Sequence, residues 1–191
     1  GLRQARGDLP GQVRQLREFP RLSAYSRRGL AHLVSDIGQL RLGREPKVTT
    51  REDLIVAAAR SWIGTPYRHQ QSCKSAGTDC LGLVRGIWRD IVGCEPERVP
   101  AYTADWSETF SREDLLSAAR RWLYQLPDGK PQPGNVLLFR VYDGGVAKHL
   151  GIMAQSGDKP SFVHAYSGHG VVESPLSTPW ARRIVARFSF P

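Results

Sequence analysis

Residues 78–88 read Thr-Asp-Cys-Leu-Gly-Leu-Val-Arg-Gly-Ile-Trp, and this stretch predicts a helix with a cysteine in its first turn. Its apolar positions recur on one helical face, at Cys80, Val84, Ile87, Trp88 and Ile91. Asp79 is a residue type favoured at helix N-caps. A thiol at this end lies at the positive pole of the helix dipole, which favours the thiolate. Cys80 is therefore a candidate nucleophile, although a free cysteine is also common as a small buried apolar residue.

Length and composition set the limits for the rest of the chain. It has 191 residues, 40% hydrophobic and 24% charged, which is typical of a soluble globular domain with an extension. No apolar run reaches the roughly 18 residues of a membrane span, and no apolar segment near residue 1 suggests a secretory signal. Three cysteines without a Cys-x-x-Cys pair argue against a disulfide framework and a cysteine zinc cluster, so Cys73 and Cys94 are expected to be structural or incidental.

The positive charge is concentrated in the N-terminal segment. Residues 1–47 hold ten Lys and Arg against four Asp and Glu, a net +6, whereas residues 48–191 hold seventeen against fourteen, a net +3. We expect residues 1–47 to form a partly helical, basic accessory arm. Its charge favours an anionic partner such as nucleic acid, membrane or cell-wall polymer, but a solvated arginine-rich surface explains it equally well. No zinc-finger, P-loop or RNA-recognition motif indicates specific nucleic-acid binding.

Three helices are predicted in the first part of residues 48–191. Thr50 and Asp53 resemble a capping box, and the helix that they start has Leu54, Ala58, Ser61 and Trp62 on one side, with a stop at Gly64. The Cys80 helix is expected to end near Gly93. A third helix is expected from Ser111, with an apolar face of Leu115, Ala119, Trp122, Leu123 and Leu126.

The hydrophobic period changes to two after residue 134, which predicts strands. The expected strands cover residues 136–142, 149–154, 161–166, 170–173 and 183–190. Helices followed by hairpin-connected strands indicate an α+β fold, with N-terminal helices packed on an antiparallel sheet of five to six strands.

Two histidines fall on neighbouring predicted strands, His149 at the start of the second and His164 inside the third. Side chains opposite each other on antiparallel strands have Cβ atoms about 4.5–5.5 Å apart, so the two rings can hydrogen-bond. With Cys80 above them, His149 would take the thiol proton and later protonate the leaving amine, and His164 would orient the ring of His149. A surface or core histidine is the plain alternative for each.

A His-His-Cys metal site is a rival use of the same residues. It lacks a nearby carboxylate in the local sequence, and we rank it lower, so neither a metal nor a cofactor is expected. His69, in the loop before Cys80, is less committed to any role.

Four segments occur in the order found in one family: Gly64-Thr-Pro-Tyr67, Thr78-Asp-Cys-Leu-Gly-Leu-Val84, Lys148-His-Leu-Gly-Ile-Met153 and Phe162-Val-His-Ala165. They resemble the NlpC-type cysteine peptidases, papain-like bacterial and phage enzymes that cut cell-wall peptides. The resemblance covers roughly residues 50–190, so that residues 48–191 would form the peptidase domain. It implies a papain-like fold and a catalytic triad of Cys80, His149 and His164.

The resemblance also implies roles for two neighbours of the nucleophile. The Tyr67 hydroxyl would help the backbone N–H of Cys80 to stabilise the oxyanion. Asp79 would face the free amine of the substrate or an adjacent polar group. The substrate implied is the bond between γ-D-glutamyl and a diamino acid in peptidoglycan stem peptides, cleaved through a thioester acyl-enzyme.

Two departures from the family pattern bear on subsite preference. Leu81 stands where the family usually has serine, and Arg68-His-Gln-Gln-Ser-Cys73 replaces a Gly-Gly stretch. The surrounding sequence resembles the branch found in phage tails and gene transfer agents, whose enzyme sits in the tail tip and opens the wall. That resemblance implies cytoplasmic synthesis, attachment to tail proteins through residues 1–47, and action on the wall in the periplasm.

Two alternatives to a wall endopeptidase stay open. One is a catalytically idle structural or wall-binding tail module, and the other is a papain-like amidase or acyltransferase that acts on another amide. The irregular segment after the Cys80 helix contains Tyr102 and Trp106, which are the aromatic residues best placed to line a substrate groove.

Overall fold

The computed structural model describes residues 48–103 and 113–191. The arm of residues 1–47, the predicted helix start at Ser111 and the groove candidate Trp106 lie outside the described residues. Within the described part, three helices precede the main sheet: α2 (Arg51–Arg60), α3 (Cys80–Ile91) and α4 (Asp114–Trp122). A short helix, α5 (Thr178–Ala181), lies between the last two strands of the chain. None of the helices in this part of the chain is long and apolar enough to cross a membrane.

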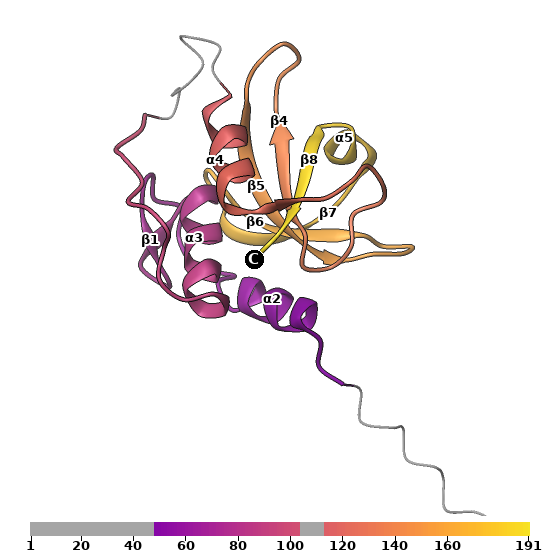
Figure 1. Cartoon of the computed structure of the whole chain (residues 1–191), viewed down its shortest axis with the longest axis horizontal. Coiled ribbons are helices and arrows are strands. Elements are labelled where there is room, and N and C mark those ends of the chain that lie inside the picture. The colour runs from indigo at the N-terminus through magenta and orange to yellow at the C-terminus, as the bar shows by residue number, and fades with distance from the viewer. Residues whose placement is uncertain (1–47, 104–112) are drawn as a thin grey trace, which may run out of the picture. The chain divides into compact units, whose positions relative to one another are not determined.

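The main sheet has six antiparallel strands in the order β3-β8-β4-β5-β6-β7 (Figure 1). The strands are β3 (Tyr124–Gln125), β4 (Val136–Arg140), β5 (Ala147–Gln155), β6 (Ser161–Tyr166), β7 (Gly170–Pro175) and β8 (Ile184–Ser189). The predicted α+β class and antiparallel sheet are confirmed. The sequence pattern missed the two-residue β3, and also a separate ribbon of β1 (Ser72–Cys73) and β2 (Gly77–Thr78) just before Cys80.

Helix α2 starts as predicted but faces the core differently. Thr50 and Asp53 form a reciprocal capping box. The predicted side is right for Trp62 and wrong for Leu54, which is 52% exposed. The buried side chains are Ile55, Val56, Ala59 and Trp62. The reason lies in α3, where a Cβ at Gly86 would meet the Trp62 ring at 2.0 Å. The missing side chain lets this ring pack against α3, and that contact sets the rotation of α2.

Helix α3 is capped at its start by Asp79, whose Oδ1 accepts a hydrogen bond from the Gly82 amide at 2.8 Å. The predicted N-cap is thus confirmed, and the helix ends at Ile91, close to Gly93. Its first turn packs against the loop before it, since a Cβ at Gly82 would lie 1.9 Å from the Gln71 carbonyl oxygen. Glycine at this position therefore lets the loop pass directly against the first turn of α3, which carries Cys80.

The sheet buries different side chains on its two faces. One core joins α2, α3 and α4 to alternate strand residues that include Leu150, Ile152 and Val163. A second core contains Leu137, Phe139, Met153, Phe162 and Leu176, with Trp180 of α5 packed against it. His149 pairs with Phe139 in the register of β4 and β5, so its side chain belongs to the face of the second core.

Candidate active site

The thiol of Cys80 lies against strand β5 where that strand carries His149. Its Sγ is 3.8 Å from the carbonyl oxygen of Lys148, and the backbone N–H of Leu150 donates a hydrogen bond to the sulfur. These two residues flank His149 in the chain. The helix start and the strand, 69 positions apart, therefore bring the predicted nucleophile and the predicted base to one place.

The two predicted histidines form a hydrogen-bonded pair. His149 Nε2 is 2.8 Å from His164 Nδ1, and His164 Nε2 is 3.0 Å from the hydroxyl of Ser174 on β7. Both imidazoles are buried, with exposed fractions of 9% and 1%. Because Nε2 of His149 is used in this pair, Nδ1 is its remaining ring nitrogen. The glycine of the His-Leu-Gly segment also has a role here, since a Cβ at Gly151 would meet the Phe162 ring at 2.7 Å.

The tautomers of the pair decide whether His149 can act as a base. If His164 donates from Nε2 to Ser174 Oγ, its Nδ1 accepts from the Nε2–H of His149, and Nδ1 of His149 keeps a lone pair. If the Ser174 hydroxyl donates instead, the protons shift and Nδ1 of His149 carries a hydrogen. Ser174 was not predicted from the sequence, because a serine on a strand gives no signal of its side-chain partner on the neighbouring strand.

Trp180 of helix α5 covers the histidine pair on the side away from α3. Its ring centroid lies 5.6 Å from that of His149 and 5.4 Å from that of His164. Phe139 and Phe162 also contact this ring, at 5.3 and 5.2 Å. The sequence pattern missed Trp180. The Ser177-Thr-Pro start signals a helical turn, but nothing in the sequence says what a half-buried tryptophan in that turn contacts.

The thiol of Cys80 and the imidazoles of His149 and His164 rest in their neutral forms. Burial lowers the pKa of His149 to about 3 and that of His164 to about 4. Burial and the nearby charge of Asp79 raise the pKa of the Cys80 thiol to about 12, although backbone N–H groups of Leu150, Leu81 and Cys80 act in the opposite direction. The prediction that the helix end favours a thiolate was therefore wrong for the resting site, because loss of hydration outweighs the helix dipole.

Tyr67 lies beside the start of α3. An isolated bridge pairs it with Thr78, and the backbone of the next residue, Arg68, donates to the Thr78 carbonyl at 2.9 Å. Burial, together with the nearby Cys80 and Asp79 side chains, raises the pKa of its phenol above the usual range, so the phenol is a protonated donor at neutral pH.

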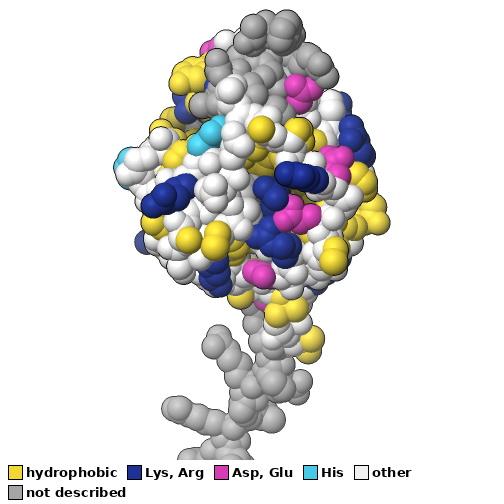
Figure 2. All heavy atoms as spheres, turned by 90° about the vertical axis from the view of Figure 1, so that its left-hand side faces the viewer, with side chains coloured by type: hydrophobic (Ala, Val, Ile, Leu, Met, Phe, Trp, Pro, Cys, Tyr) yellow, Lys and Arg dark blue, Asp and Glu magenta, His cyan; other side chains and the backbone are white. Residues whose placement is uncertain are grey.

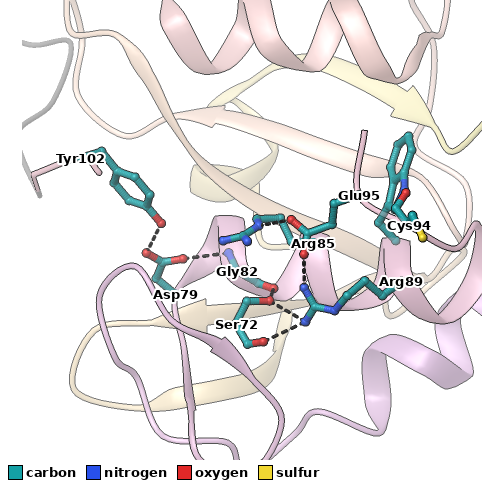
Figure 3. A network of polar contacts seen from close by, with 9 residues as sticks. Ser72, Asp79, Gly82, Arg85, Arg89, Cys94, Glu95 and Tyr102 are labelled. Atoms are coloured by element: carbon teal, nitrogen blue, oxygen red, sulfur yellow. Dashed lines mark hydrogen bonds and ion pairs between the residues drawn. The ribbon is translucent and has the colours of Figure 1, made fainter. Parts of the chain in front are cut away.

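Asp79 is buried and engaged by groups of the protein itself (Figure 3). Oδ1 accepts from the Gly82 amide at 2.8 Å, and Oδ2 accepts from the Gln70 amide at 2.7 Å and the Tyr102 hydroxyl at 2.5 Å. Only 2% of the residue is exposed. Polar groups of the loop before Cys80, of α3 and of Tyr102 thus surround this carboxylate.

The same network ties ribbon β1 to helix α3. Arg89 donates to the Ser72 carbonyl and hydroxyl at 2.8 and 2.9 Å, and the Ser72 hydroxyl donates to the Gly82 carbonyl at 2.5 Å. Arg85 and Arg89 also bind Glu95, and these bonds keep its pKa below the usual range against the effect of partial burial. The loop before Cys80 and the segment after α3 are therefore both fixed to α3.

Charges of both signs share the surface on this side of the molecule. In Figure 2, which faces the side carrying α3 and β1, Lys and Arg side chains lie next to Asp and Glu side chains. A uniformly basic face, as expected for a binding site for long polyanions, is not seen in this view.

A pocket of about 610 Å³ opens between α3, α4 and residues 95–100. Its lining includes Leu81 and Leu150, the chain neighbour and the hydrogen-bond donor of Cys80, and most of the other lining side chains along the helices are apolar. Leu81, where the family usually has serine, thus contributes an apolar wall close to the nucleophile. Tyr102, the second predicted groove residue, lies at Asp79 and is not part of this lining.

The rival metal site has no support from the geometry. The imidazoles of His149 and His164 bind each other, and within residues 48–103 and 113–191 no three His, Cys, Asp or Glu side chains gather as metal ligands. All three cysteines are free, Cys73 and Cys94 on the surface and Cys80 half-buried.

Comparison with known proteins identifies relatives of this arrangement. The model of the NlpC/P60 family matches residues 64–188. The chain is 29% identical over 133 residues to the murein DD-endopeptidase MepS/murein LD-carboxypeptidase of Escherichia coli K12, covering 66% of this chain and 59% of that protein. It is 28% identical over 144 residues to the gamma-DL-glutamyl hydrolase of Bacillus subtilis 168, covering 74% and 29%. The chain therefore spans less than two thirds of either relative.

Solved structures share the fold. An NlpC/P60 family protein from Bacillus cereus ATCC 10987 superposes with a TM-score of 0.51 at 19% identity, over 74% of this chain and 41% of that one. An NLP/P60 family protein, similar to lipoprotein, from Staphylococcus aureus Mu50 gives 0.50 at 19% identity, over 87% and 50%. The predicted papain-like α+β fold is confirmed by these likenesses.

Proposed function

The chain belongs to the NlpC/P60 family, and on that premise we propose that it is a cysteine endopeptidase of peptidoglycan stem peptides. One observation carries the proposal: Cys80, at the start of α3, lies against the β5 segment that holds His149, and His149 is hydrogen-bonded to His164. A nucleophile, a base and an orienting group are the parts that acyl transfer needs.

In the proposed reaction, the substrate carbonyl carbon approaches Cys80 Sγ. The thiol proton passes to Nδ1 of His149 as the S–C bond forms, because the resting site is a neutral thiol and a neutral imidazole. The backbone N–H of Cys80 and the Tyr67 hydroxyl donate to the oxyanion. His164 holds the tautomer of His149 by its bond to Nε2.

The tetrahedral intermediate then collapses with cleavage of the C–N bond. The leaving amine takes the proton from His149, and the acyl group remains on Cys80 as a thioester. Water attacks the thioester while His149 accepts a proton from it, and the thiol regains that proton as the acid product leaves. Every proton in the cycle passes through one imidazole.

The bond that we propose is the one between γ-D-glutamyl and a diamino acid. The family resemblance favours it, and so does the name of the Bacillus subtilis relative, a gamma-DL-glutamyl hydrolase. The name of the Escherichia coli relative specifies other wall bonds, so the position of cleavage is the part of the proposal that an experiment must fix first.

We also propose the biological setting that the sequence suggests. Residues 48–191 would form the peptidase domain, and the basic residues 1–47 would attach it to a phage-tail or gene-transfer-agent tail protein or to anionic wall. The protein would be made in the cytoplasm and would act on the wall in the periplasm. Pull-down of tail proteins by the full chain but not by residues 48–191 tests this setting.

Defined disaccharide-tripeptide and disaccharide-tetrapeptide muropeptides test the activity. We expect mass spectrometry to show new termini after γ-D-glutamate with the wild-type chain and none with Cys80→Ala. Cleavage of another amide would favour the amidase or acyltransferase alternative. Intact substrates with a folded wild-type chain would favour the idle structural or wall-binding module.

A further inference from the structure

The loop that departs from the family pattern holds Tyr102 in place. His69 Nε2 and Gln70 Nε2 lie 2.8 and 2.5 Å from the carbonyl oxygen of Tyr102. The His69 ring also meets the Tyr102 ring edge to face, with centroids 5.0 Å apart. Both residues belong to the loop between Tyr67 and Cys80, and their side-chain nitrogens fix the backbone of Tyr102.

Tyr102 in turn covers the carboxylate of Asp79. Its hydroxyl donates to Oδ2 at 2.5 Å, and the same oxygen accepts from the Gln70 amide. Burial and the bond to Asp79 raise the pKa of the Tyr102 phenol, so it stays a donor at neutral pH. The imidazole of His69 also lies next to this oxygen, with its Nδ1 3.6 Å from Asp79 Oδ2.

The Asp79 carboxylate is therefore already satisfied. A carboxylate offers about four lone-pair sites, and three of them have donors from the protein here. With 2% of the residue exposed, no path remains for a substrate ammonium unless Tyr102 moves away. Replacing a good hydrogen bond inside the protein by one to the substrate brings little net gain.

We propose that Tyr102, held by His69 and Gln70, closes Asp79 to the substrate, so that this chain cleaves stem peptides whose amino terminus is blocked as an amide as readily as those with a free amine. Stem peptides still joined to the glycan through that amide are then substrates. The inference rests on the proposed endopeptidase function and concerns its substrate class. Tyr102 acts as a specificity-determining residue through Asp79 and takes no part in proton transfer.

The test compares two tripeptides, L-Ala-γ-D-Glu-diaminopimelate with a free amino terminus and the same peptide N-acetylated. We expect wild-type kcat/KM values within about threefold of each other, because no charged hydrogen bond distinguishes the two. Tyr102→Ala uncovers Asp79 and should shift the ratio toward the free amine by about tenfold or more, the effect of one charge-assisted hydrogen bond.

Two further variants separate the role in specificity from a structural role. Gln70→Ala keeps the hydroxyl of Tyr102 but removes one of its supports, and it should shift the ratio in the same direction by a smaller factor. Tyr124→Ala, which removes an exposed tyrosine on β3, should leave both kcat/KM values unchanged.

The outcomes are distinct. A wild-type preference for the free amine above about thirtyfold, the size of a strong charged contact, overturns the inference alone. So does an unchanged ratio in active Tyr102→Ala and Gln70→Ala. Cleavage of neither peptide by the folded wild-type chain overturns the proposed function and this inference with it.

Discussion

On the helix side of the site, Asp79 accepts hydrogen bonds from two backbone amides and a phenol, whereas on the strand side His149 and His164 share one bond inside a cluster of aromatic rings. The helix side thus holds a buried charge that polar donors must satisfy. The strand side holds two neutral bases that packing keeps dry. Hydrogen bonds to a charged carboxylate therefore hold the helix side together, whereas on the strand side the exclusion of water keeps two imidazoles neutral.

The helix side and the strand side both affect the ionisation of Cys80 and His149. The charge of Asp79 and burial both oppose formation of a thiolate at Cys80, and burial opposes formation of an imidazolium at His149. A resting ion pair is therefore disfavoured, and the proton must move when substrate is present. Substitutions on the strand side should change catalytic activity and its pH dependence, whereas substitutions on the helix side should mainly change the free energy of unfolding.

The largest loss of catalytic activity is expected from a substitution on the strand side, at the proposed base His149. His149→Ala removes the only proposed proton carrier, and kcat/KM should fall by about 10³-fold or more. Hydrolysis of the defined tripeptide measures it, with Tyr124→Ala, at an exposed residue of β3, as the control. Activity of His149→Ala within tenfold of wild type would remove His149 from the mechanism.

The helix side should show its largest effect in stability. Asp79→Ala removes the cap of α3 and leaves the Gln70 amide and the Tyr102 hydroxyl without their acceptor, at a cost of about 2–4 kcal/mol. The free energy of unfolding from urea titration measures this loss. Asp90→Ala, an exposed aspartate near the end of the same helix, is the control, and equal losses in the two variants would contradict the assigned network.

Trp180, which covers the histidine pair, should influence the pH dependence of kcat/KM. The pKa of His149 lies below its ordinary value, so the neutral base persists as pH falls and is lost only near pH 3. Trp180→Ala admits water, which favours the imidazolium and raises this pKa, so the acid limb of kcat/KM should move up by about one pH unit or more. Trp180→Phe should move it less.

An NMR titration of the imidazoles in Cys80→Ala gives the same answer without turnover. With Trp180 present, both rings should stay neutral well below pH 6, and with alanine at 180 they should titrate at higher pH. Coincident titration curves in the two backgrounds would show that Trp180 only fills the second core.

Much of the fold follows from local patterns in the sequence. The capping box at Thr50, the cap at Asp79 and the period-two segments each depend on neighbouring residues, so they were predictable. The burial of Ile55, Val56 and Ala59 instead of Leu54 was not, because it depends on Trp62 meeting Gly86 in another helix. Strand β3 has only two residues, too few for a period to show.

Some residues of the site could also be predicted from the sequence and others could not. Cys80, His149 and His164 stand at recognisable positions, and the structure brings the three segments together. Ser174 meets His164 through the register of β6 and β7, and Trp180 and Tyr102 come from other parts of the chain, so no spacing rule in the sequence predicts these contacts. The charge state of Cys80 was mispredicted because a helix-end rule ignores burial.

The role of Cys80 as the nucleophile is tested by digestion of a defined disaccharide-tripeptide with wild type, Cys80→Ala and a Cys73→Ala/Cys94→Ala double variant. Mass spectrometry should show cleavage after γ-D-glutamate by wild type and by the double variant, whose changed cysteines are exposed, and none by Cys80→Ala. Equal cleavage by Cys80→Ala would contradict the assignment of Cys80 as the nucleophile.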